Sequence, residues 1–105
     1  MATALFTDGP TALTGTAATV YTGAGTLGSI IRGIHVAAVG GVDTWFTLSI
    51  GTDAAGTRWA YQREVLANKE FDWSGFLFIP NGTIIQALAR ASSEAVLVIS
   101  GTEET

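Results

Sequence analysis

The sequence predicts an all-β protein, an antiparallel β-sandwich of about eight strands with jelly-roll-like or immunoglobulin-like topology. Three observations predict it. Short runs of alternating apolar and polar residues recur about every 8–12 residues, separated by Gly, Pro, Asn, Asp and Ser, which is typical of sandwiches and barrels. No segment combines a helix N-cap with a sustained 3.6-residue apolar period. At 105 residues, the chain has the length of one domain.

The clearest expected strand is residues 46–50, whose apolar residues face the core while Thr47 and Ser49 face outward. A turn at 53–56 then returns the chain along 57–62, beside the strand it has just left. Residues 30–38 are apolar on both faces, which predicts a central strand or a subunit contact. The other expected strands are residues 18–22, 71–73, 76–79, 83–89 and 95–100.

Turn residues suggest how these strands are connected. Asn81-Gly82 predicts a hairpin between the strands that flank it, and residues 90–94 are expected to join the last two strands as a pair. Asp8-Gly9-Pro10 predicts a turn near the N-terminus. We therefore divide the single domain into an extended Thr/Gly/Ala-rich arm at 1–28, with one or two short strands, and a sandwich body at 29–105. The arm is expected to order fully only on binding its neighbours.

Charged residues are scarce. Asp, Glu, Lys and Arg make up 13% of the chain, whereas a soluble domain averages about 25%, and the mean hydropathy is +0.39. The surface must therefore be largely neutral, and we expect part of it to be covered by other subunits. The five cations are scattered, which argues against a nucleic-acid partner. Neither a membrane span nor a signal peptide is evident, so we expect synthesis in a cytoplasm.

Motifs that carry chemistry are few. Gly23–Gly28 matches GxGxxG, but the β-branched residues after it are poor material for the helix that a dinucleotide site needs, so we expect a glycine loop. His35 is the single histidine and is expected to be a hydrogen-bonded structural or interface residue. Glu70 and Asp72 share one strand face, and a solvated face explains them better than catalysis. We therefore expect no catalytic residue, no cofactor and no metal.

Aromatic residues are the best candidates for a binding surface. The rings of Trp45, Trp59, Tyr61 and Trp73 are suited to stack on a sugar or to anchor a subunit contact. Trp45 is the strongest candidate because it alternates out of phase with the core residues of its strand. The predicted interface or glycan contacts are Trp45, Trp59, Tyr61 and His35.

Three stretches of the chain resemble small β-sandwich virion proteins of tailed bacteriophages, a group with head-decoration and tail-associated members. They are GIHVA at 33–37 with FTLSIG at 46–51, LANKEFDW at 66–73 with GFLF at 75–78, and NGTIIQA at 81–87 with VLVISG at 96–101. The resemblance implies a non-enzymatic homo-oligomer, a trimer being favoured, that docks on major capsid or tail proteins. It carries over no functional residue.

Together, these observations favour a phage virion structural protein, either a capsid decoration or a minor capsid protein, that stabilises the particle through homo-oligomeric and lattice contacts. The alternative is a tail-fibre or baseplate-associated module that binds host surface glycan through Trp45, Trp59 and Tyr61. Loss of glycan binding in Trp45→Ala distinguishes the two.

Overall fold

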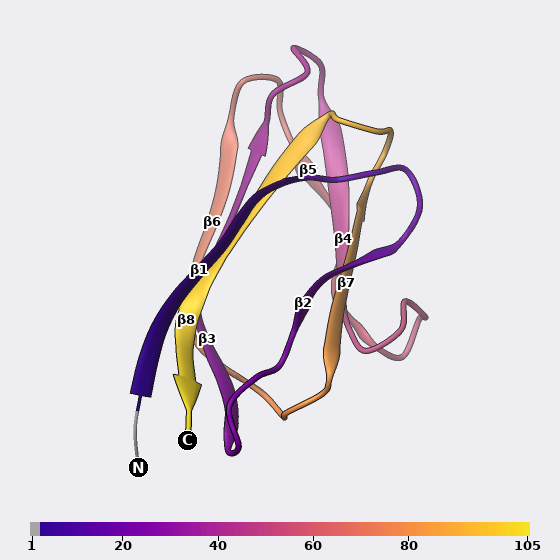
Figure 1. Cartoon of the computed structure of the whole chain (residues 1–105). Coiled ribbons are helices and arrows are strands. Elements are labelled where there is room, and N and C mark those ends of the chain that lie inside the picture. The colour runs from indigo at the N-terminus through magenta and orange to yellow at the C-terminus, as the bar shows by residue number, and fades with distance from the viewer. Residues whose placement is uncertain (1–2) are drawn as a thin grey trace.

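In the computed structural model, residues 3–105 are described, and they form eight strands and no helix. The strands make two four-stranded sheets, ordered β1-β8-β3-β6 and β2-β7-β4-β5, which face each other as two layers (Figure 1). The expected antiparallel sandwich of about eight strands is confirmed. The strands are β1 (Thr3–Ala12), β2 (Ala18–Thr22), β3 (Gly28–Ala38), β4 (Thr44–Ile50), β5 (Arg58–Val65), β6 (Glu70–Ile79), β7 (Ile84–Ala89) and β8 (Ala95–Glu104).

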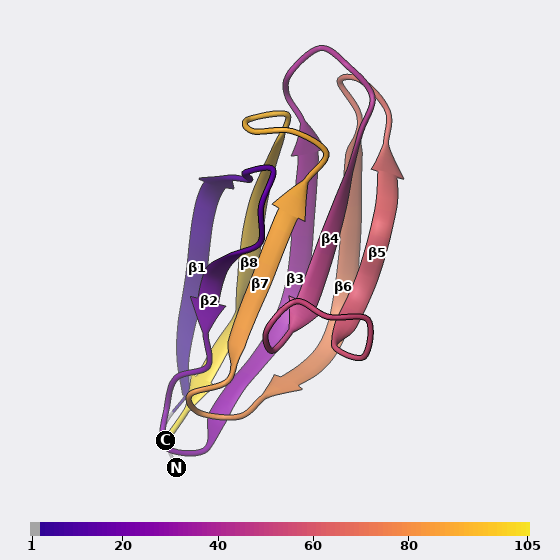
Figure 2. The same ribbon diagram turned by 90° about the vertical axis from the view of Figure 1, so that its right-hand side faces the viewer.

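The strand order is that of a jelly roll. The pairs β1·β8, β2·β7, β3·β6 and β4·β5 are the four steps of one long antiparallel hairpin. Rolling this hairpin up brings β8 beside β3 and β7 beside β4, which completes both sheets. Of the two topologies that the sequence left open, the jelly roll is the observed one. Figure 2 looks onto the β2-β7-β4-β5 sheet with the other sheet behind it.

The core lies between the two sheets, and aromatic pairs close both of its open sides. Phe6 of β1 stacks on Tyr21 of β2, with ring centroids 4.8 Å apart. On the opposite side, Trp59 of β5 meets Trp73 of β6 edge to face, with centroids 5.2 Å apart. These four strands are the outermost strands of the sheets, so each pair seals the gap between two sheet edges. The largest fully buried apolar side chains are Phe46, Leu13, Ile31, Ile34, Leu48, Ile79, Ile85, Leu97, Ile99 and Val36.

The outer face of β4 is covered, although its alternation predicted solvated hydroxyls. Thr47 and Ser49 are 2% and 0% exposed. The Thr47 hydroxyl accepts a hydrogen bond from the backbone N–H of Gln62 at 3.0 Å, where β5 bulges and Gln62 takes a positive φ of 45°. Ser49 donates to Asp53 in the β4–β5 loop at 2.8 Å. The buried hydroxyls therefore fix the bulge and the loop, as buried polar groups must find partners.

The N-terminal segment forms one of the two edge strands of each sheet. β1 pairs with β8 from Thr3 to Ala12, and β2 pairs with β7. The predicted turn at residues 8–10 was wrong, because β1 continues through it with only a register shift between Asp8 and Thr11. An edge strand tolerates Pro10 because one side of its backbone needs no partner. Residues 1–2 of the predicted arm lie outside the described residues. That this segment orders only on binding stays a prediction.

Residues 71–73 and 76–79, expected as two strands, belong to one strand, β6. Gly75 does not interrupt the strand, and a side chain at this position has no room. A Cβ on Gly75 would lie 2.9 Å from Cζ2 of Trp73, whose ring occupies that space. The glycine is therefore a packing site within the strand and not the break that the sequence suggested.

The predicted hairpin at Asn81-Gly82 was wrong in its pairing. The turn itself exists: Gly82 has a φ of +84°, and the Thr83 N–H donates to the Pro80 carbonyl at 3.1 Å. However, β6 and β7 lie in different sheets, as do β7 and β8, which were also expected to pair. Among the eight strands of residues 3–105, β4 and β5 are the one pair that is both consecutive in sequence and hydrogen-bonded, and this pairing was predicted.

Candidate functional site

The four predicted contact residues do not share one surface. Trp59 packs against Trp73 and the core. Tyr61 is exposed, with the Arg58 guanidinium 4.4 Å from its ring centroid. Trp45 is half-buried on the outer side of β4, and His35 lies on the outer side of β3 in the other sheet. The roles of these residues in interface or glycan contacts stay predictions.

The glycine motif forms a loop followed by a strand, as the sequence predicted. β3 begins at Gly28, where the motif requires a helix. Polar contacts hold this loop: the Asn81 amide donates to the Gly25 carbonyl at 2.6 Å, and the Ala24 N–H donates to the Ser29 hydroxyl at 2.9 Å. Tyr21 shares a 2.7 Å hydrogen bond with Ser29, and burial raises the pKa of Tyr21. The loop is a fixed connection between the two sheets.

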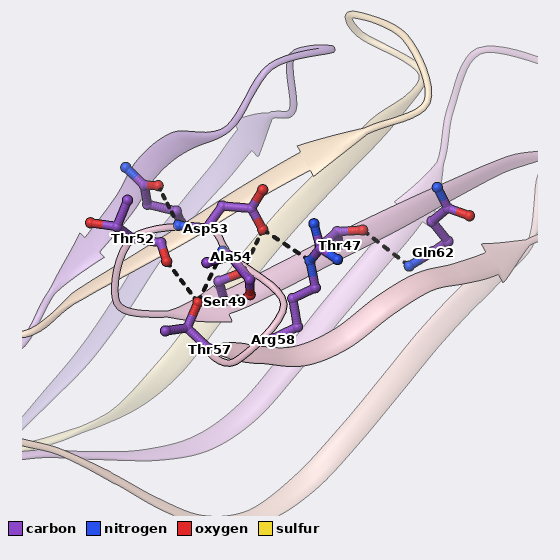
Figure 3. A network of polar contacts seen from close by, with 9 residues as sticks. Thr47, Ser49, Thr52, Asp53, Ala54, Thr57, Arg58 and Gln62 are labelled. Carbon is purple, nitrogen blue, oxygen red and sulfur yellow. Dashed lines mark hydrogen bonds and ion pairs between the residues drawn. The ribbon is translucent and has the colours of Figure 1, made fainter.

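A polar network surrounds the β4–β5 loop (Figure 3). Asp53 accepts hydrogen bonds from Ser49 at 2.8 Å and from Arg58 at 3.4 Å, and these bonds, led by that of Ser49, lower the pKa of Asp53. The Asp53 N–H in turn donates to Gln86 of β7 at 3.0 Å. The contacts of Asp53 tie the loop to its own sheet, and Thr57 bonds Thr52 and Ala54 within the loop, so the network holds the loop in place.

The outer face of the β1-β8-β3-β6 sheet carries large apolar side chains that are exposed to solvent. Leu5 is 87%, Phe76 73% and Phe78 57% exposed. The strand register places Leu5, Thr102, Ile30 and Phe78 in one row across the four strands. Isolated apolar side chains are ordinary on a surface, but several together on one sheet face mark an interaction site. We call this outer face the open face.

The open face has a hollow beside its protruding rings. The hollow measures about 400 Å³ and is lined in part by Leu5 and Thr7 of β1, Arg32 of β3 and Thr102 of β8. The guanidinium carbon of Arg32 lies 4.2 Å from the ring centroid of Phe76. Arg32 therefore stands between the hollow and the protruding phenylalanines of β6. One face thus carries both apolar protrusions and a depression.

Further along the open face, His35, Glu70 and Asp72 come together. β3 and β6 pair so that His35 lies opposite Asp72. The His35 Nδ1 is 2.5 Å from Asp72 Oδ1, and its Nε2 is 3.8 Å from Glu70 Oε2. One candidate ligand atom from each residue lies within 4.8 Å of the others. No local sequence signal links these residues, because His35 lies 35 positions before Glu70.

Within residues 3–105, no helix is long and apolar enough to cross a membrane. No protein-family model and no curated protein sequence matches the chain. Among solved structures, it is similar to a chain from Bacillus endospore appendages, described as a family of disulfide-linked pili, with a TM-score of 0.51 and 12% identity over 97% of this chain and 86% of that chain.

A second similar structure is a chain of the T13 IBDV viral particle, with a TM-score of 0.50 and 13% identity over 96% of this chain. Our chain spans 31% of that chain's length, so it corresponds to one part of a larger protein. At these identities, both similarities concern the fold.

Proposed function

We propose that the chain is a non-enzymatic structural protein of a tailed-bacteriophage virion, a capsid decoration or minor capsid protein that assembles through its open face. The observation that carries the proposal is the exposure of Leu5, Phe76 and Phe78 together on one sheet face. Leaving such side chains in water forgoes roughly 1.5–3 kcal/mol each, which a subunit contact recovers.

A second copy of this chain is the partner that fits the open face best. A contact between two identical faces must be self-complementary, and the open face offers both protruding rings and a hollow of about 400 Å³. Its size is also suitable. Four strands spaced about 4.8 Å apart and ten residues long project an area of about 600 Å². The uneven side-chain surface makes the accessible area larger than this projection. A standard interface covers about 800 Å² per partner.

Other features of the chain support a role in an assembly. Its scarcity of charge suits a surface that is covered by neighbours. Pili and an icosahedral viral particle contain chains of similar fold, so the jelly roll is compatible with assembled particles. The chain has no cysteine, and an assembly of it is therefore held without disulfides of its own. The trimer that the phage resemblance favours stays a prediction.

Particle composition tests this proposal. Virions are purified from cells that express the chain, heads are separated from tails, and each fraction is analysed by peptide mass spectrometry. We expect the chain in the head fraction, in many copies per particle. Its absence from particles, while it is abundant in the same cells, contradicts a virion role. Its recovery with tails alone replaces the decoration role by a tail-associated one.

One observation favours the alternative, a glycan-binding module of a tail fibre or baseplate. Tyr61 is 58% exposed, and the Arg58 guanidinium lies over its ring. Both residues belong to β5, in the β2-β7-β4-β5 sheet and not in the sheet of the open face. Trp59, another aromatic of this alternative, is half-buried and packs against Trp73. Titration with host surface glycan, compared between the wild type and Tyr61→Ala, tests it. Saturable binding that the variant lacks supports the module, and equal binding by both proteins contradicts it.

A further inference from the structure

We propose that His35 and Glu70 form one half of a zinc site on the open face, and that the same two residues of a second copy complete it. The inference rests on the proposed function, because it needs two open faces in contact. The site differs from the apolar contact in chemistry and in position along the sheet. It lies toward the end of the sheet at which β6 begins.

Asp72 orients the imidazole of His35. Its Oδ1 is 2.5 Å from Nδ1, so the carboxylate accepts the Nδ1–H and leaves the lone pair of a neutral ring on Nε2. Histidines that bind a metal through one nitrogen nearly always donate the other N–H to a carboxylate, a carbonyl or water. The Asp72–His35 pair already has this arrangement, and Nε2 points toward the side on which Glu70 lies.

The gap between Nε2 of His35 and Oε2 of Glu70 has the size of a bridged pair. At 3.8 Å, it is too long for a hydrogen bond. Two ligands of a tetrahedral zinc ion, each about 2.0–2.1 Å from the metal, lie about 3.4 Å from each other. A shift of a few tenths of an ångström therefore admits the ion. The Glu70 side chain is 59% exposed and is free to make that shift.

Two protein ligands are half of the four that a structural zinc ion takes, and symmetry supplies the others. In a two-fold contact, each residue near the axis meets its own counterpart. His35 lies on β3, one of the two central strands of the four-stranded sheet, and a face-to-face pair whose two-fold axis passes beside His35 brings two such half-sites together. The completed site contains two imidazole nitrogens and two carboxylate oxygens, both of which are zinc ligands. Its role is to lock the contact.

Zinc titration of the full chain tests the inference. The protein is freed of metal with EDTA, dialysed, and titrated with zinc chloride at neutral pH while its mass is followed by light scattering and its bound zinc by equilibrium dialysis. We expect one zinc ion per two chains and at least a tenfold tighter self-association. Asp72→Asn should weaken zinc binding about 10–100-fold, as loss of an orienting partner does.

Variants separate this inference from the proposed function. His35→Ala should lose the response to zinc and keep the association seen in EDTA; His35→Gln serves if the alanine variant does not fold. Glu64→Gln, an exposed carboxylate of β5 in the other sheet, is the control and should respond as the wild type does. The zinc site is wrong if His35→Ala still responds, if zinc has no effect, or if each chain binds its own ion without a change in mass. A wild type that stays monomeric in EDTA refutes apolar self-assembly instead.

Discussion

Replacing Phe76 by threonine should separate the assembly of this protein from its folding. Threonine retains the β-strand preference of the site while removing the ring. A buried phenylalanine covers about 150–250 Å², and because Phe76 is 73% exposed, most of that area is still available to a partner. At about 25 cal/mol per Å², burying 73% of that area contributes about 3–4.5 kcal/mol. Allowing for the area that threonine keeps, we expect a loss of about 2 kcal/mol per copy. Both copies of a face-to-face pair carry the substitution, so the pair loses about 4 kcal/mol and its Kd rises roughly 1,000-fold.

The subunit itself should be little affected. The contact that Phe76 makes with Arg32 is an exposed cation–π pair, worth about 0.5–1 kcal/mol, so the free energy of unfolding measured on dilute protein should fall by no more than that. Sedimentation velocity at several concentrations gives the Kd, and urea denaturation gives the stability. Tyr61→Thr, an exposed aromatic of the opposite sheet, is the matched control. A Kd that stays within threefold of wild type in Phe76→Thr, or that rises equally in the control, refutes the reasoning.

The remaining predictions concern the fold. Phe46→Ala removes a fully buried ring and should lower the free energy of unfolding, measured by urea denaturation, by about 3–5 kcal/mol. A decrease under 1 kcal/mol would show that Phe46 does not lie in the core. Gly101→Ala puts a Cβ onto the Ile30 carbonyl of the neighbouring strand and should cost about 1–3 kcal/mol, whereas Gly56→Ala, with open space around it, should not. The raised pKa of Tyr21 means that its contribution to stability is complete below the unfolded pKa of about 10 and is lost as the pH rises through the folded pKa. Thermal melts should therefore fall faster in alkali for wild type than for Tyr21→Phe, and identical slopes contradict this. The lowered pKa of Asp53 gives a contribution that is complete above about pH 4 and is lost as the pH falls further; Asp53→Asn should flatten that acid loss.

Local patterns in the sequence located the strands but not their partners. Residues 46–50 alternate, and the turn after them is short, so both β4 and its pairing with β5 could be predicted. Asn81-Gly82 also turns the chain, but turn chemistry fixes only the reversal and not the sheet in which the next strand lies. That choice depends on which apolar faces must meet across the core, and these belong to strands far apart in the sequence.

The candidate site could be predicted only in part. The outward direction of Phe76 could not be predicted, because an apolar run such as 76–79 has no obvious outward side. Gly75 appeared to be a break, so the alternation that puts Phe76 outward and Leu77 inward was not followed through. The meeting of His35 with Glu70 depends on the register of β3 with β6, which no local signal sets.

The central claim is that the open face is a subunit contact, and the mass of the metal-free protein in solution tests it most directly. Light scattering in EDTA at several concentrations should give a discrete oligomer of the 10.9 kDa chain that dissociates on dilution and in Phe76→Thr. An oligomer of two copies indicates a face-to-face pair, and an oligomer of three supports the trimer that the phage resemblance implies. A monomer at every concentration contradicts the claim, because Leu5, Phe76 and Phe78 would then remain in water without a partner of their own kind.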